Sequence, residues 1–243
     1  MTDPALTRAR PNRGAKLGTA VVDQLVDDIV RGVLAPGATL SPEADLCEEF
    51  GVSRTVIRES VKVIQEKGLL RIQHGRGTQV TDPLEWNLLD ETVLTAMIRN
   101  DETLAVLDEL VVVRTTLEAE MASAAARLGT AEQLNAVADE LAQMESLLHS
   151  VPTFAAADIR FHDAVMVASG NRLGRTIVTR IHDKARDSMR YHGDYTQPAM
   201  QLTVTEHRRI HDALQAGDEA EASAAMRAHI LGSWARRRPT KIN

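Results

Sequence analysis

The sequence predicts a mainly α-helical protein in two parts. An N-terminal winged helix-turn-helix with a small β-hairpin wing comes first, and a C-terminal bundle of antiparallel α-helices follows. Three observations favour this fold class. Hydrophobic residues make up 44% of the 243 residues and aromatic residues only 3%, which favours helices packed on helices. Apolar residues recur with the helical period along most of the chain. Short β-like runs flank His74-Gly75-Arg76-Gly77.

The chain begins with a polar segment and a first helix. Residues 1–16 hold two prolines, a glycine and four basic residues without periodicity, and we expect them to form a flexible basic arm. From Thr19 onward, apolar residues fall at the i, i+3, i+4 and i+7 positions of an amphipathic helix. We expect Pro36-Gly37 to end this pattern.

The next segment predicts two short helices joined by a tight turn. Ser41 can cap a helix whose first residue is Pro42, and Gly51 turns the chain at its end. Ser53 is the natural N-cap of the following helix, and Gly68 is its expected end. Two helices around so short a glycine-containing turn are typical of a helix-turn-helix.

The second of these helices begins with side chains that suit DNA. Arg54 and Arg58 can each donate two hydrogen bonds to guanine, and Thr55 suits phosphate oxygens. In the wing, Gly75 lets the backbone approach a groove, and Arg76 can enter the minor groove. We therefore expect this part to bind double-stranded DNA. The alternative is a solvated basic face on a protein-binding module.

Charge and cysteine content support this division of roles. The net charge is −6, but residues 1–80 carry 11 Lys/Arg against 10 Asp/Glu, whereas residues 81–243 carry 17 against 24. Only the first part therefore suits phosphates. Cys47 has no second cysteine to pair with, and no apolar run has the length of a signal peptide or membrane span. We expect a cytoplasmic protein without a membrane partner.

The predicted DNA-binding domain covers residues 17–81, and residues 82–85 are the expected linker because Thr81-Asp82-Pro83 interrupts the pattern. Residues 86–236 are expected to form one helical domain, followed by a basic tail at 237–243. Short turn signals separate its main helical patterns, so neighbouring helices should pack antiparallel. The patterns cover residues 102–128, 131–148, 153–168, 173–192, 198–216 and 218–236.

Polar residues of this helical region have a spacing that suits a metal site. Asp158 and His162 are four residues apart and share a helix face. His207 and His211 have the same spacing on a later helix, and His229 lies on the last one. A buried carboxylate among imidazoles is unfavourable unless it is paired, and this donor set suits a divalent transition metal. Taken alone, each histidine is more often an ordinary hydrogen-bonded or solvated residue.

The stretch from Gly32 to Val80 resembles the DNA-binding domain of GntR-family transcription regulators, above all in SPEADLCEEFGVSRTVIRESVKVIQEKGLL followed by HGRGTQV. This resemblance implies that the three helix residues and two wing residues named above contact operator DNA. Members often carry arginine near the start of the first helix of the motif. This sequence has Ala44 there, so that contact is not expected here.

Residues 86–232 resemble FCD, the effector-binding domain of the FadR subgroup of this family. Its metal-binding members share Asp-x3-His, then Glu-His, then a final His. These places are filled by Asp158, His162, Glu206-His207 and His229. The resemblance implies that the aspartate and the three histidines hold a divalent metal, zinc in the first place, with nickel or manganese as alternatives. His211 would then lie outside the ligand set, and its exchange with His207 stays open.

The resemblance also implies a role for Arg114, since an arginine on the first long helix faces the metal cavity in this family and binds the effector's carboxylate. A guanidinium binds a carboxylate through two hydrogen bonds. The alternative is an Arg114 on the surface that forms an i, i+4 ion pair with Glu118. The WNLLD run at 86–90 resembles the sugar-acid-responsive members, such as galactonate-type and gluconate-type repressors. Asn171 is expected to cap a helix first and to line the pocket second.

These inferences together predict a ligand-responsive transcriptional regulator rather than an enzyme. We expect a homodimeric repressor that a small carboxylate, such as a hexonate, releases from a palindromic operator. One alternative is a DNA-binding regulator with a purely structural metal and no acid effector. Another is a metal-dependent hydrolase or isomerase with a DNA-binding module, but no further carboxylate or histidine is evidently placed as a general base.

Overall fold

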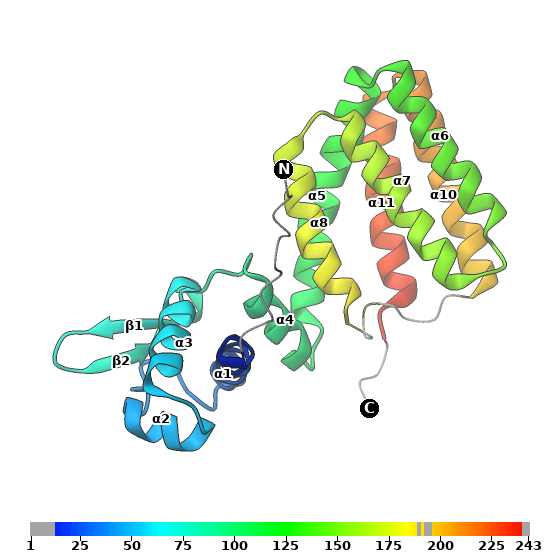
Figure 1. Cartoon of the computed structure of the whole chain (residues 1–243). Helices are drawn as coiled ribbons and strands as arrows, with labels where there is room; N and C mark the ends of the chain where they lie inside the picture. Colours follow the sequence, from blue (N-terminus) through cyan, green and yellow to red (C-terminus); the bar gives the residue numbers. More distant parts are fainter. Residues whose placement is uncertain (1–12, 189–190, 192–195, 240–243) are drawn as a thin grey trace, which may run out of the picture. The chain divides into compact units, whose positions relative to one another are not determined.

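The computed structural model describes residues 13–188, 191 and 196–239. The chain forms two compact units, Met1–Asn100 and Asp101–Asn243 (Figure 1). The predicted arm at 1–16 lies outside the described residues up to residue 12, and the predicted tail at 237–243 lies outside them from residue 240. Within the part that the structure describes, no helix is both long and apolar enough to cross a membrane.

The first helix, α1 (Arg13–Val30), is shifted toward the N-terminus relative to its prediction. It begins inside the predicted arm because its early turns pack on a later helix, where Ser60 Oγ donates a 3.2 Å hydrogen bond to the Gly18 carbonyl oxygen. It ends well before Pro36-Gly37, because Gly32 adopts a left-handed φ of 76° that a helix cannot continue.

The helix-turn-helix is present, with one difference in its capping. Helix α2 (Glu43–Phe50) follows Pro42, and no side chain caps it, so the expected cap by Ser41 is wrong. The proline ring fixes φ at −54°, which suits the entry to a helix. Gly51 ends α2 in the left-handed conformation as predicted. Ser53 Oγ accepts a hydrogen bond from the Val56 amide and caps α3 (Arg54–Glu66), also as predicted.

The wing is a two-stranded antiparallel sheet. Strands β1 (Leu70–Gln73) and β2 (Gly77–Val80) pair with Leu70 opposite Val80, and Thr39 forms an additional bridge to Gln79. Gly68 precedes the wing with φ at 83°, which allows the chain to turn out of α3.

Helix α4 (Glu91–Asn100) belongs to the first unit, whereas residues 86–236 are predicted to form the second domain. After the short 3-10 helix η1 (Pro83–Glu85), the chain leads into α4, whose apolar face is buried against α1. Asn100 anchors its end through a 2.7 Å hydrogen bond to Asp27. The shared core includes Val22, Leu25 and Ile29 of α1, Ile57 and Ile64 of α3, and Val93 and Ala96 of α4.

The second unit is an all-helical bundle, which confirms the predicted fold class (Figure 1). Helix α11 packs on α5 and α10, α6 packs on α7, and α5 also contacts α7 and α8. Asn171 caps α8 as expected, since its side chain accepts a 2.9 Å hydrogen bond from the Gly174 amide. Helix α8 ends at Arg186, earlier than the predicted end at residue 192. The helices are α5 (Ala105–Leu128), α6 (Ala131–Ser146), α7 (Val151–Ala168), α8 (Arg172–Arg186), α10 (Gln197–Ala216) and α11 (Glu219–Arg237).

Candidate metal centre and effector cavity

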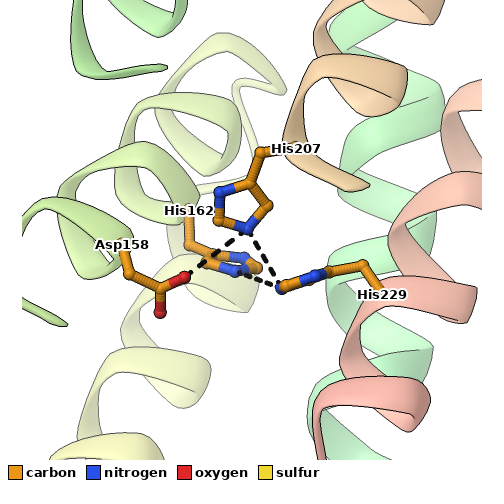
Figure 2. A group of neighbouring side chains, drawn as sticks. All are labelled: Asp158, His162, His207 and His229. Atoms are coloured by element: carbon orange, nitrogen blue, oxygen red, sulfur yellow. Dashed lines mark hydrogen bonds and ion pairs between the residues drawn. The ribbon is translucent and has the colours of Figure 1, made fainter. Parts of the chain in front are cut away.

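Three helices of the second unit bring four side chains to one point (Figure 2). Asp158 and His162 come from α7, His207 from α10 and His229 from α11. One potential ligand atom from each lies within 4.8 Å of those of the others. All three imidazoles are buried, and Asp158 is partly exposed. The side chains that the sequence singled out as metal ligands thus converge inside the bundle.

The nitrogen atoms of this cluster face one another at ligand-like separations. His229 Nε2 lies 3.0 Å from His207 Nε2 and 3.2 Å from His162 Nε2. Two nitrogen ligands of a tetrahedral zinc ion lie about 3.3 Å apart, given a Zn–N distance of about 2.0–2.1 Å. Asp158 Oδ1 lies 3.5 Å from His207 Nε2 and supplies an oxygen donor. The spacing therefore fits a divalent metal ion.

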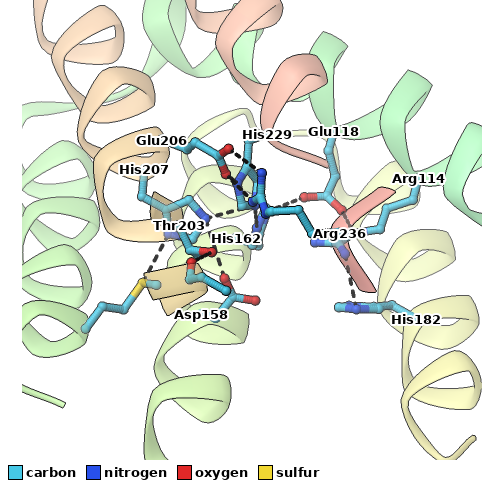
Figure 3. A network of polar contacts seen from close by, with 12 residues as sticks. Arg114, Glu118, Asp158, His162, His182, Thr203, Glu206, His207, His229 and Arg236 are labelled. Atoms are coloured by element: carbon cyan, nitrogen blue, oxygen red, sulfur yellow. Dashed lines mark hydrogen bonds and ion pairs between the residues drawn. The ribbon is translucent and has the colours of Figure 1, made fainter. Parts of the chain in front are cut away.

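Two carboxylates, those of Glu118 and Glu206, contact imidazole nitrogens of the cluster (Figure 3). His162 Nδ1 contacts Glu118 Oε2 at 2.5 Å, and His229 Nδ1 contacts Glu206 Oε2 at 2.9 Å. An ionised carboxylate only accepts hydrogen bonds, so each Nδ1 is the donor, and in a neutral ring the Nε2 then presents a lone pair. Facing lone pairs repel, and a metal cation at their centre removes this repulsion.

The surroundings of His207 and His229 favour their neutral imidazoles. Burial lowers the pKa of His207 well below its usual value, and the nearby imidazoles of His229 and His162 lower it further. Burial also lowers the pKa of His229, although the hydrogen bond to Glu206 opposes the shift. A metal displaces no proton from the unprotonated nitrogen of a neutral imidazole, so the lowered pKa values of His207 and His229 favour coordination.

His207 is held in the cluster by its surroundings, whereas His211 lies elsewhere. The ring of Phe161 stacks on that of His207 at 4.2 Å between centroids, and His207 Nδ1 lies 3.1 Å from Met144 Sδ. His211, one turn later, contacts Asp212 at 3.2 Å on the outside of α10. The structure thus brings His207, and not His211, to the other candidate ligands.

Arg114 lies in a buried network and not on the surface. Its Nε donates to Glu118, so the i, i+4 ion pair exists, but in the interior. Its Nη1 lies 3.1 Å from the Tyr191 hydroxyl and 3.2 Å from His182 Nε2, while Nη2 has no hydrogen-bond partner among the described residues. Burial opposes ionisation of Glu118, but Arg114 and His162 outweigh it and hold the Glu118 pKa far below its usual value.

A cavity of about 1120 Å³ opens beside Asp158. One side is the beginning of α7, and the other is the end of α8 together with Tyr191. Arg114 does not line this cavity; it borders a separate void of about 10 Å³. Asp158 belongs both to the candidate metal ligands and to the cavity wall, so the cavity and the cluster share this residue. The cavity lining includes Val151, Ala155, Ile159, His182, Arg186 and Tyr191.

Sequence reasoning missed Glu118 as a partner of a ligand and missed His182 and Tyr191 altogether. The sequence indicates Glu118 only as the ion-pair partner of Arg114. Its spacing from Arg114 shows that the two share a helix face, but not that this face meets α7. Asn171 acts as the cap of α8 and is absent from the lining of the large cavity.

The predicted DNA-contacting side chains are exposed in the first unit. Arg54 and Thr55 lie at the beginning of α3, and Gly75 and Arg76 form the tip of the wing. Arg58 is also exposed, but its Nε lies 2.9 Å from both carboxylate oxygens of a glutamate on α2. DNA binding would have to compete with this surface ion pair.

Comparisons with known proteins agree with this architecture. Residues 17–80 match the model of bacterial regulatory proteins of the gntR family, and residues 109–232 match the FCD domain. The chain is 32% identical to the galactonate operon transcriptional repressor of Escherichia coli, over 84% of this chain and 90% of that protein. It is 31% identical to the regulator LutR of Bacillus subtilis, over 83% of this chain and 92% of LutR.

A solved structure supports the fold alone. Lar, described as controlling expression of the Listeria monocytogenes agr system, superposes with a TM-score of 0.57 at 17% identity, covering 95% of this chain and 98% of Lar. The two family models and the full-length relatives lead to one conclusion: this chain is a transcriptional regulator, not an enzyme, and it belongs to the GntR family, with an FCD domain after its helix-turn-helix.

Proposed function

We propose that this protein is a repressor whose affinity for an operator is lowered by a small carboxylate bound at a metal in the FCD domain. The observation that carries the proposal is the position of Asp158. This residue is one of the four clustered donors and also lines the large cavity. A cavity ligand and a bound metal would therefore meet, which a purely structural metal would not require.

The metal would be held by Asp158, His162, His207 and His229. Three imidazole nitrogens and one carboxylate suit zinc, and nickel or manganese are the alternatives. When bound, the metal supplies a positive charge and a coordination position for an oxygen of the ligand. The chain's own residues hold the donors in place, since Glu118 and Glu206 each accept a hydrogen bond from a ligand histidine.

The effector would be a hydroxylated carboxylic acid, with a hexonate such as galactonate as the first candidate. The cavity is large enough for such a molecule, since small-ligand sites commonly enclose about 300–1000 Å³. His182 and Tyr191 offer polar groups on its wall, and Arg114 holds both of them by hydrogen bonds. The galactonate repressor among the relatives supports the choice of acid.

DNA binding would fall to Arg54, Thr55 and Arg58 of α3, with Gly75 and Arg76 of the wing. A cytoplasmic homodimer would place two such units on a palindromic operator, because two-fold symmetry in the protein matches two-fold symmetry in the site. The effector changes DNA affinity only through its different affinity for two arrangements of the protein.

The test combines two measurements on the full chain. The zinc-loaded protein is first heated with a panel of sugar acids, di-acids and fatty acyl compounds, since a ligand of the native state raises the melting temperature. Acids that do so are then added to the protein bound to DNA selected from a random pool. A hexonate that stabilises the protein and weakens DNA binding supports the proposal. Full zinc occupancy without any acid effect on DNA affinity would favour a structural metal.

A further inference from the structure

We infer that the large cavity has a second anion-binding end, formed by Arg186 and Arg237, which favours effectors with two acidic groups. The inference rests on the proposed function and deepens it, because it specifies an anionic group at each end of the hydroxylated acid. One group would bind at the metal beside Asp158, and the other at the two arginines. A carboxylate and a phosphate both have the chemistry that this second end requires.

The cavity is long enough to hold two acidic groups at separate places. Val151 and Asp158 both line it from α7, which rises about 10 Å between them at about 1.5 Å per residue. Arg175 early in α8 contacts Asp163 late in α7 at 2.6 Å, so these helices run antiparallel. Arg186 at the end of α8 therefore lies toward the beginning of α7. An extended six-carbon chain measures about 6 Å between its end carbons, given C–C bonds of about 1.5 Å. An acid of this length can reach from Asp158 toward the arginine end.

Arg186 has a buried donor that no described residue satisfies. Its Nη2 donates to Asp183 on the same helix, but its Nε is buried and has no hydrogen-bond partner among the described residues. A buried N–H group without an acceptor is unfavourable, especially on a charged side chain. The side chain is 30% exposed and lines the cavity, so rotation about its own bonds can present Nε to an anion. A guanidinium can then donate two parallel hydrogen bonds to a carboxylate or a phosphate.

Arg237 adds a second guanidinium from another helix. It is the last residue of α11 and lines the same cavity. Its Nε donates a 3.2 Å hydrogen bond to the Ser233 carbonyl oxygen, and its guanidinium carbon lies 5.0 Å from the centre of the Tyr191 ring. A cation over an aromatic face is attracted to the ring, which holds this guanidinium beside the cavity. The ends of α8 and α11 thus each contribute one arginine to the cavity wall.

Two carboxylates also line this end of the cavity, and each has a cationic partner. Asp183 accepts a hydrogen bond from Arg186, and Asp187 lies 3.6 Å from Lys184 Nζ. The side chain of Asp183 is 49% exposed and that of Asp187 is 68% exposed, so water screens both charges. With Arg237, the cations outnumber these carboxylates among the described residues. A ligand anion at this end therefore meets a net positive charge.

The experiment compares acids that differ only at the far end, by isothermal titration calorimetry of the zinc-loaded full-length protein. Galactonate and galactarate share a six-carbon hydroxylated chain, and the second acid has a carboxylate in place of the terminal hydroxymethyl group. Galactarate should bind about tenfold more tightly, because a hydrogen bond to a charged group contributes at least this factor. Gluconate and 6-phosphogluconate form the second pair and test a phosphate at the same end.

Substitutions at the arginine end should change the ratio of the dissociation constants of galactonate and galactarate. Arg186→Gln and Arg237→Gln should each lower this ratio, whereas Asp183→Asn should raise it, because it removes a negative charge and releases Arg186. Arg160→Gln is the matched control, since Arg160 forms an exposed ion pair with Glu140 on the bundle surface. A loss of metal would affect both acids and leave the ratio unchanged.

The outcomes separate this inference from the proposed function. A tighter complex with the second acid of either pair, lost in the arginine variants, supports the second anion-binding end and shows which anion it prefers. Binding of galactonate and gluconate without a gain of more than about twofold for their partners would overturn the inference and leave the proposed function standing. A gain that persists in both arginine variants would also overturn it. If none of the four acids binds, the proposed effector and this inference both fail. If Arg186→Gln does not fold, Arg237→Gln and Asp183→Asn still decide the matter.

Discussion

Acidification should destabilise the helical domain through His182. This imidazole accepts a hydrogen bond from Arg114 Nη1 at 3.2 Å, so a proton on its Nε2 would face a guanidinium. Burial and the charge of Arg114 hold the His182 pKa well below its usual value, although Glu118 opposes them. In the unfolded chain the pKa returns to about 6.5. Below that pH the unfolded state binds the proton and the native state does not, so stability falls as the pH falls.

The size of the effect follows from linkage. Well below the unfolded pKa, one such group costs about 1.4 kcal/mol of unfolding free energy for each pH unit. Between about pH 7.5 and about pH 5.5 the integrated loss is about 1.4 kcal/mol, because only the lower half of the interval lies below the unfolded pKa. The loss continues until the pH reaches the depressed pKa of the native state.

The assay is urea unfolding of the full chain at these two pH values, with a chelator present so that metal does not compete with protons. Tryptophan fluorescence in a Trp86→Phe background reports the second unit, where Trp234 is 6% exposed. Between these two pH values, the free energy of unfolding of His182→Gln should fall by about 1.4 kcal/mol less than that of the parent. His149→Gln, at an exposed position, is the control. Equal pH dependence in His182→Gln and the parent would refute the reasoning.

Three further predictions concern the DNA-binding unit. Arg58→Ala should weaken binding to selected DNA by about 5–150-fold, because one good base contact contributes about 1–3 kcal/mol. Fluorescence anisotropy measures this affinity. Unchanged affinity would show that Arg58 does not contact the DNA. Glu43→Gln should raise that affinity up to about fivefold, since it frees Arg58 from a surface ion pair that contributes about 0.2–1 kcal/mol. A lower affinity would show that Glu43 and DNA do not compete for Arg58. Gly68→Ala should lower the free energy of unfolding by about 1–3 kcal/mol, because its Cβ would lie 2.5 Å from the Glu85 carbonyl oxygen. Urea unfolding monitored by the fluorescence of Trp86 measures this loss. Gly32 has a similar φ but open space around it, so Gly32→Ala should lower the free energy of unfolding by less. Equal losses in the two variants would show that the contact with Glu85 does not cause the loss.

The sequence was most informative where short-range periodicity decides the structure. Spacing predicted the helix-turn-helix, the wing and the helical bundle, and it put Asp158 and His162 on one face of α7. His207 and His229 were identified by residue type and family pattern, because nothing in the spacing between separate helices says that they meet. Local rules also failed at Ser41, where the fixed φ of Pro42 makes a side-chain cap unnecessary.

Long-range packing determined what the sequence left open. Helix α4 has an apolar face that either unit could cover, and only the structure shows that α1 covers it. The environment of Arg114 has the same origin. Its ion pair with Glu118 is local, but its contacts with His182 of α8 and with Tyr191 are long-range, and burial changes a weak surface pair into a tightly held one.

In the proposed function, metal binding and ligand response would be linked by the distribution of the candidate ligands over the helices. The four candidate ligands join α7, α10 and α11, and Glu118 adds α5 through its contact with His162. A metal that binds only the native arrangement stabilises it by about 4 kcal/mol at a concentration a thousand times its Kd. A bound metal would therefore hold these helices in one arrangement. An acid that enters from the α8 side can alter DNA affinity only if it binds a second arrangement of the same helices more tightly.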